Sequence, residues 1–152
     1  MKLAEALQER ADLDRKISQL NVRLSKTVLV QQGEKPAEDP NVLLGEVRDC
    51  TDRLETLIRQ INLTNCQYMV DGISLTAIIA KKDMLLRKLN VFRNALDNAL
   101  QSTNRARGTE IKIVPAIDVG ILRKEADEIA KQIRLLDNKL QQANWSAELI
   151  ED

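Results

Sequence analysis

Two arginines beside a glycine are the residues of this sequence whose type and spacing best suit the binding of an anion. Arg105 and Arg107 precede Gly108, between two predicted elements. Guanidinium groups hold a phosphate or a carboxylate through paired hydrogen bonds. The other interpretation is a solvated loop whose charge complements the C-terminal dipole of the preceding helix. We favour the loop, because two arginines are a weak signal, and keep Arg105 and Arg107 as possible anion contacts.

Catalytic and metal-binding chemistry is poorly supplied by this composition. The chain has no histidine, which excludes imidazole bases, Ser-His-Asp nucleophiles and histidine metal ligands. Its two cysteines, Cys50 and Cys66, are too few for a cysteine-only zinc site. Carboxylates recur at helical spacing, as in Glu125 and Glu128, which is typical of a solvated face. We therefore expect a protein that is not an enzyme, with no catalytic residue, no metal, no cofactor and no small-molecule substrate.

Three asparagines, Asn62, Asn65 and Asn144, fall near the ends of predicted helices. Asn65 follows Ile61 by four residues, where an apolar seam, the line of apolar side chains along one face of a helix, would continue. A polar side chain at this position can fix the register of helix packing. Asparagine is also a common cap. The alternative is a binding role for the pair Asn62 and Asn65. We favour capping or register for all three.

Four segments repeat apolar residues at alternating steps of three and four, which is the pattern of an amphipathic helix. They run over about residues 2–25, 40–61, 75–100 and 119–143. Asp39, Ser74 and Asp118 are predicted N-caps of the last three. We therefore predict a mainly α fold of four long antiparallel amphipathic helices, bundle-like or coiled-coil-like, in a single helical domain over residues 1–152.

Two short stretches break the helical pattern and predict strands. Residues 27–31 are rich in β-branched side chains, and residues 110–115 alternate before they stop at Pro115. If successive helices run antiparallel, both stretches fall at the same end of the bundle. A lone two-stranded ribbon is only marginally stable in water. We therefore expect this small two-stranded β element to pack on the helices or to join a sheet from another subunit.

The charge balance argues against several kinds of partner. The 152 residues include 23 Lys and Arg and 23 Asp and Glu, so the formal net charge is zero. Nucleic-acid binders usually carry a basic excess, as do polybasic membrane-surface proteins, so we expect no nucleic-acid partner. No stretch approaches the ~20 apolar residues of a membrane span, and no apolar signal peptide opens the sequence. We expect a cytoplasmic protein, which two reduced cysteines suit.

Several short motifs follow one another in the order seen in a known family. They are residues 1–7, 10–13, 33–40, 61–65, 71–72, 110–112 and 144–145. Together they resemble the septicolysin-like family of small bacterial proteins, and the resemblance spans nearly the whole chain. The octapeptide Gly-Glu-Lys-Pro-Ala-Glu-Asp-Pro and the terminal Asn-Trp are its most specific parts. The resemblance implies a cytolytic, pore-forming toxin and brings no active site with it.

Long aliphatic seams are the feature that points most directly to function. One small bundle buries only part of its surface, and a second copy is the simplest cover for the rest. A second apolar line on the third helical segment and the sole tryptophan give the predicted interface residues: Leu75, Ile79, Leu86 and Trp145. We therefore predict a non-catalytic structural or interaction protein that self-associates. The alternative hypothesis is a pore-forming cytolysin. Only under this hypothesis do we expect a membrane as a partner.

Overall fold

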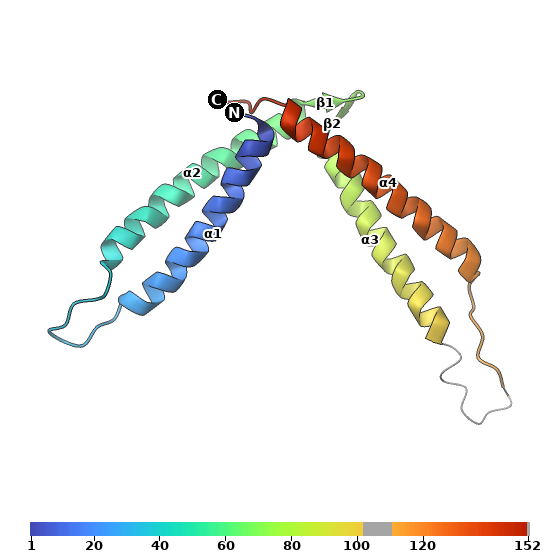
Figure 1. The fold of residues 1–152 in the computed structure, drawn as a ribbon, viewed down its shortest axis with the longest axis horizontal. Helices are drawn as coiled ribbons and strands as arrows, with labels where there is room; N and C mark the ends of the chain where they lie inside the picture. The colour runs from blue at the N-terminus through green and yellow to red at the C-terminus, as the bar shows by residue number, and fades with distance from the viewer. Residues whose placement is uncertain (102–110, 152) are drawn as a thin grey trace. The chain divides into compact units, whose positions relative to one another are not determined.

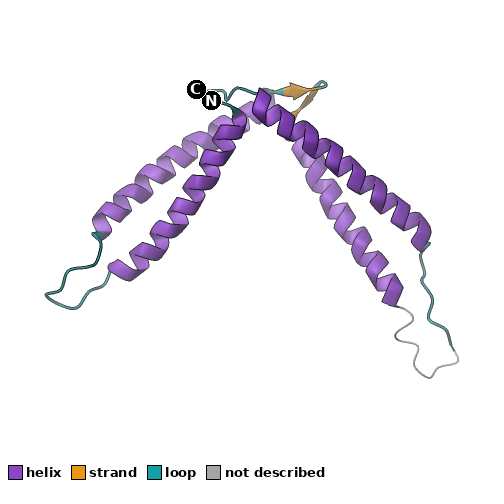
Figure 2. Cartoon of the chain, in the orientation of Figure 1, coloured by secondary structure: helices purple, strands orange, loops and turns teal. Residues whose placement is uncertain are grey.

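Four long helices and one short β-hairpin make up the protein in the computed structural model, which describes residues 1–101 and 111–151. The helices are α1 (Leu3–Thr27), α2 (Pro40–Gln67), α3 (Leu75–Leu100) and α4 (Val119–Ser146). Strands β1 (Met69–Val70) and β2 (Ile73–Ser74) lie between α2 and α3 and pair antiparallel (Figures 1 and 2). This confirms the predicted fold class, mainly helical with a small two-stranded element.

The two strands lie in a different part of the sequence from the predicted ones. Asp71 and Gly72 connect β1 to β2, both with positive φ (52° and 78°), as a two-residue hairpin turn requires. Residues 28–31 and 111–115 have no strand, so the strand predictions were wrong for these residues. β-Branched side chains favour extended backbone, but a strand also needs a partner. Among the described residues, the Asp71-Gly72 turn brings two strands together as partners.

The predicted caps explain where three helices begin. The Asp39 carboxylate accepts a hydrogen bond from the Asn41 amide (2.9 Å), and the Ser74 hydroxyl accepts one from the Ala77 amide (3.3 Å). Asp118 accepts one from the Ile121 amide (3.0 Å). Each side chain satisfies an amide that the first helical turn leaves without a partner. All three capping predictions are confirmed.

Helices α1 and α2 form the body of one compact unit, Met1–Tyr68 with the chain from Ala143 onward. Its inner surface follows the predicted seams: Leu20, Leu43 and Cys50 are buried together, and further aliphatic side chains pack around them. The chain ends close this unit, because the Leu3 amide donates to the Ala147 carbonyl (3.0 Å) and the Leu149 amide to that of Met1 (2.8 Å).

Helices α3 and α4 form the second compact unit, Met69–Gln142, which also contains the β-hairpin. The two helices lie side by side (Figure 1), and Leu89, Leu96, Ala126 and Ile129 form the core between them. Phe92 is partly buried against this core. The aliphatic periodicity of the sequence thus accounts for both helical pairs. The single domain over residues 1–152 stays a prediction.

Candidate interaction surface

Helix α2 carries a second line of apolar side chains besides the one that packs on α1. Leu43, Cys50 and Leu57 are buried in the first unit at intervals of seven residues. Leu44, Thr51 and Ile58 each follow one of them by one position, which turns their side chains about 100° around the helix. Leu44 and Ile58 are each 38% exposed. α2 therefore presents an aliphatic strip that its own hairpin does not cover.

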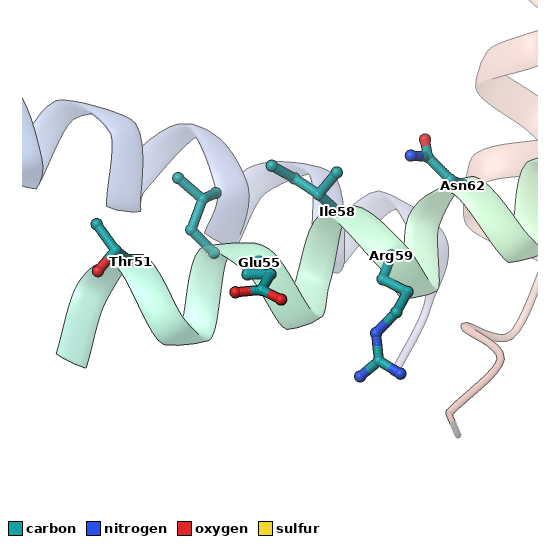
Figure 3. A pocket seen from close by; sticks show the side chains of 6 residues that line it. Thr51, Glu55, Ile58, Arg59 and Asn62 are labelled. Carbon is teal, nitrogen blue, oxygen red and sulfur yellow. The ribbon is translucent and has the colours of Figure 1, made fainter. Parts of the chain in front are cut away.

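This strip widens into a shallow hollow on α2 (Figure 3). Six side chains line it, and all belong to α2: Thr51, Leu54, Glu55, Ile58, Arg59 and Asn62. Ile58 and Asn62 point to one side of the helix in this view, and Arg59 points to the other. We call this set the α2 face. It has an aliphatic centre and one charged edge.

The charged edge of the α2 face holds one acid and one base. Glu55 and Arg59 are four residues apart, which places them on neighbouring turns of the same side of the helix. Both are exposed side chains. A charged edge beside an aliphatic strip is the usual composition of a helix that packs on another helix, because the charges then select orientation and partner.

A different edge of α2 is held to α1 by an ion pair. Arg53 donates to Glu9 through Nε (2.6 Å) and a second guanidinium nitrogen (2.8 Å). This hydrogen bonding lowers the pKa of Glu9 and raises the pKa of Arg53. Lys16 and Glu46 also join α1 to α2, at 3.3 Å. These contacts fix which side of α2 faces α1 and so which side remains open.

The predicted interface residues differ widely in exposure. Leu75, the first residue of α3, is 0% exposed, so it has no surface left to offer a second copy. Ile79 is half-buried. Leu86 is 38% exposed and Trp145 is 56% exposed, and both remain predicted interface residues. The structure does not bring these four residues together on one described surface of a single unit, because Trp145 belongs to the first unit and the others to the second.

The three asparagines lie inside helices and not at their caps. Asn62 and Asn65 precede the end of α2 at Gln67, where the Tyr68 amide closes the helix on the Thr64 carbonyl. Asn144 lies in the last turn of α4. Their role in register, or in binding for Asn62 and Asn65, stays a prediction. Asn62 does line the α2 face, as the binding alternative requires. Arg105 and Arg107 lie outside the described residues.

Sequence reasoning missed Thr64, the residue of α2 that holds the C-terminal segment. Thr64 is buried; its hydroxyl donates to the Gln60 carbonyl (2.8 Å) and accepts from the Ile150 amide (2.9 Å). Ala147 and Leu149 of this C-terminal segment are also buried and belong to the same unit. The available signal was its spacing, since Thr64 follows the seam residue Leu57 by seven positions.

Two further kinds of feature are absent from the described residues. Among residues 1–101 and 111–151, no three cysteine or acidic side chains gather as a metal site would require. Over the same residues, no helix combines the length and the apolar character needed to cross a membrane.

Comparison with known proteins gives a family and one closely similar structure. The crystal structure of a functionally unknown conserved protein from Corynebacterium diphtheriae has 37% sequence identity to this chain and a TM-score of 0.92, with 99% of each chain covered. No curated protein matches the chain. The resemblance to septicolysin-like proteins is not tested by these findings and stays a prediction. A family model matches residues 10–149, and the chain therefore belongs to that family, a family of unknown function designated DUF6847.

Proposed function

We propose that this protein is a non-catalytic interaction protein that self-associates through its helices. The observation that carries the proposal is the α2 face, an aliphatic strip with a charged edge that its own helical pair leaves open. Burying aliphatic surface contributes about 25 cal/mol per Å². A second copy that covers the strip gains this energy without any change in the fold.

Exposed aliphatic side chains on other helices add to this support. Val22 on α1, Val91 on α3 and Leu135 on α4 are each more than half exposed. Singly exposed apolar residues are ordinary on protein surfaces. The α2 face differs because its apolar residues, Leu54 and Ile58, lie about one turn apart on the same helix. We place the contact there, with Leu86 and Trp145 as further candidates.

The other features of the proposal concern partners and location. We propose no nucleic-acid partner, no cofactor and no small-molecule substrate, in keeping with the balanced charge of the chain. We also propose a cytoplasmic location. The support is that the sequence has two cysteines, Cys50 and Cys66, a number that suits a reducing compartment.

Absolute mass in solution tests the proposal. Light scattering on a sizing column should give a mass that is a multiple of the 17.2 kDa chain, and it should persist on dilution to about 1 µM, a typical Kd scale for a specific complex. A mass of one chain at every concentration up to about 100 µM would contradict self-association, since binding weaker than that scale leaves little free energy for a specific contact.

The alternative proposal is a pore-forming cytolysin. The loop after α1 favours it, because Val28, Leu29 and Val30 are exposed together and Leu29 is 87% exposed. Aliphatic loop residues of this kind can enter the boundary region of a bilayer. Dye release from liposomes at micromolar protein would support this function. The matched control is Leu29→Ser, which should abolish release; no release by the wild type from neutral or anionic liposomes would contradict the proposal.

A further inference from the structure

We infer that Ala147 joins helix α4 to helix α1, so that the last turn of α4 provides the N-terminal cap of α1. The start of α1 is then stable only while the end of α4 is helical, and the reverse also holds. This mutual dependence is a conformational device within one chain, and it goes beyond the proposed self-association. Its basis is the capping of α1, the two backbone hydrogen bonds of Ala147 and the burial of the residues that make them.

Helix α1 differs from the other three described helices in its N-cap. Asp39, Ser74 and Asp118 each accept a hydrogen bond from a first-turn amide through a side-chain oxygen. The N-cap of α1 is Lys2, whose ammonium group can donate hydrogen bonds but cannot accept one. The amides in the first turn of α1 must therefore find their acceptors elsewhere in the chain or in water.

The carbonyl of Ala147 is the acceptor for the first of these amides. Leu3, the first residue of α1, donates its amide hydrogen to the Ala147 oxygen (3.0 Å). A second backbone hydrogen bond lies beside it, from the Leu149 amide to the carbonyl of Met1 (2.8 Å). A backbone carbonyl of the C-terminal segment thus does for α1 what a side-chain oxygen does for each of the other helices.

The amide of the same residue completes α4. Ala147 donates its amide hydrogen to the Ala143 carbonyl (2.8 Å), which continues the hydrogen-bond ladder of α4 by one residue beyond Ser146. Such a bond forms only while the residues between its two ends keep the helical conformation. If the last turn of α4 unwinds, this bond is lost, and the Ala147 carbonyl is no longer held in place for α1.

The residues that make these two hydrogen bonds are buried. Ala147 and Leu3 are each 0% exposed, and Ala143 is 4% exposed. A buried amide or carbonyl that loses its partner is costly, because water cannot readily replace that partner. The start of α1 and the end of α4 should therefore open together, and not one at a time.

A glycine substitution near the end of α4 tests this dependence without removing any of the contacts. Gln141 is an exposed residue of α4 that lies two positions before Ala143. Gln141→Gly weakens the helix there through backbone entropy. Hydrogen exchange at the Leu3 amide, measured by NMR, should then accelerate by about threefold, the factor that the difference in helix propensity between glutamine and glycine gives. The sequence beside Leu3 is unchanged, so its intrinsic exchange rate stays the same.

The matched control is the same substitution earlier in the same helix. Gln132 is also an exposed residue of α4, and it lies nine positions before Gln141. Amides at helix ends exchange through local opening, which a change several turns away does not affect. Gln132→Gly should therefore leave exchange at the Leu3 amide unchanged. Circular dichroism identifies any variant that fails to fold.

The reverse direction gives a second measurement that does not change α4. Gln8 and Gln19 are exposed residues of α1, one near its start and the other farther along. Because coupling between two sites is reciprocal, Gln8→Gly should accelerate exchange at the Ala147 amide by a similar factor. Gln19→Gly should leave that exchange unchanged. If one of the α4 variants fails to fold, this pair of α1 variants decides the question alone.

Acceleration in both directions, with neither control variant affected, would support the device. Unchanged exchange at the Leu3 amide in folded Gln141→Gly would overturn it, because the cap of α1 would then be independent of α4. Acceleration in one direction alone would also overturn it, since coupling must be reciprocal. Equal acceleration in Gln132→Gly would overturn it as well, because the effect would then reflect the stability of the whole chain. None of these outcomes depends on the mass of the protein in solution, so the device and the proposed self-association can fail separately.

Discussion

The two helical pairs of this protein are built on the same apolar pattern but differ in how the pattern is completed. Around α1 and α2, the chain ends add backbone hydrogen bonds and the buried side chains of Leu3, Ala147 and Leu149. Around α3 and α4, a tight β-hairpin precedes the first helix, and its turn residue Asp71 pairs with Lys139 (2.8 Å). The first pair is thus closed by segments distant in sequence, and the second by a local turn.

Ion pairs between neighbouring helices are a feature that the two helical pairs share. Arg53 with Glu9 and Lys16 with Glu46 connect α1 to α2, whereas Lys82 with Asp137 connects α3 to α4. Lys82 interrupts an apolar seam, and its side chain is partly buried beside Asp137. Exposed pairs of this kind contribute little stability. Their use is to set which helical faces meet, so the aliphatic residues remain the main source of stability in both pairs.

Removing a buried leucine should have the largest effect and should affect both helical pairs alike. Leu57→Ala in the first unit and Leu89→Ala in the second should each lower the free energy of unfolding by about 2–5 kcal/mol, because each leaves a cavity among aliphatic side chains. Urea unfolding followed by circular dichroism measures the change. Val91→Ala, at an exposed position of α3, should change it by no more than about 0.5 kcal/mol. A loss below about 1 kcal/mol in only one unit would break the comparison.

Thr64→Val should have an intermediate effect that is confined to the first unit. Valine keeps the shape of threonine but removes the oxygen that accepts from the Ile150 amide. An amide left without its partner in a partly buried site costs about 1–3 kcal/mol. Hydrogen exchange at the Ile150 amide should accelerate by about tenfold or more if the C-terminal segment is loosened by such an amount.

The matched control for this substitution is Thr56→Val. The Thr56 hydroxyl donates to the Asp52 carbonyl within the same helix (3.1 Å), as that of Thr64 does to Gln60. Unlike Thr64, it accepts no hydrogen bond from a distant segment among residues 1–101 and 111–151. Its replacement should leave exchange at Ile150 unchanged. Similar acceleration in both variants would show that loss of the helical hydroxyl bond is the cause, and not release of the C-terminal segment.

The helices were predictable because their signals are local. Alternating steps of three and four define each seam, and Asp39, Ser74 and Asp118 act as caps through contacts two or three residues away. The Asp71-Gly72 turn also depends on a local signal, because Asp-Gly is a preferred sequence for a two-residue hairpin turn. The strand prediction at residues 28–31 was wrong because β-branched side chains indicate only that the backbone prefers to be extended. They do not indicate which segment would pair with it.

The surface features were harder to predict because they depend on which side of a helix its neighbour covers. Leu75 and Leu86 belong to the same predicted line on α3, yet Leu75 is buried and Leu86 is exposed. The α2 face was missed for the same reason: Ile58 lies only one position from the seam residue Leu57. Thr64 was missed because its partner, the Ile150 amide, is 86 residues away in the sequence.

The smallest predicted effect is on the acid stability of the first unit. The hydrogen bonds from Arg53 lower the pKa of Glu9 in the folded protein below the value of about 4.3 expected for an unfolded chain. A lowered carboxyl pKa stabilises the fold above the unfolded value, and this contribution is lost as the pH falls through the folded value. Glu9→Gln should therefore lose less stability than the wild type between about pH 5 and pH 3.

Arg53, the partner of Glu9 in the ion pair, provides the control for this prediction. Arg53→Gln removes the groups that lower the pKa of Glu9, so it should reduce the same part of the pH dependence, and the double variant should add nothing further. At pH 7, each single variant should differ from the wild type in its free energy of unfolding by at most about 1 kcal/mol, because both side chains are partly exposed. It should also shrink in 1 M salt, which screens exposed charges. Additive effects of the two substitutions would show that Glu9 and Arg53 act through different partners, and the ion pair would then not join α1 to α2.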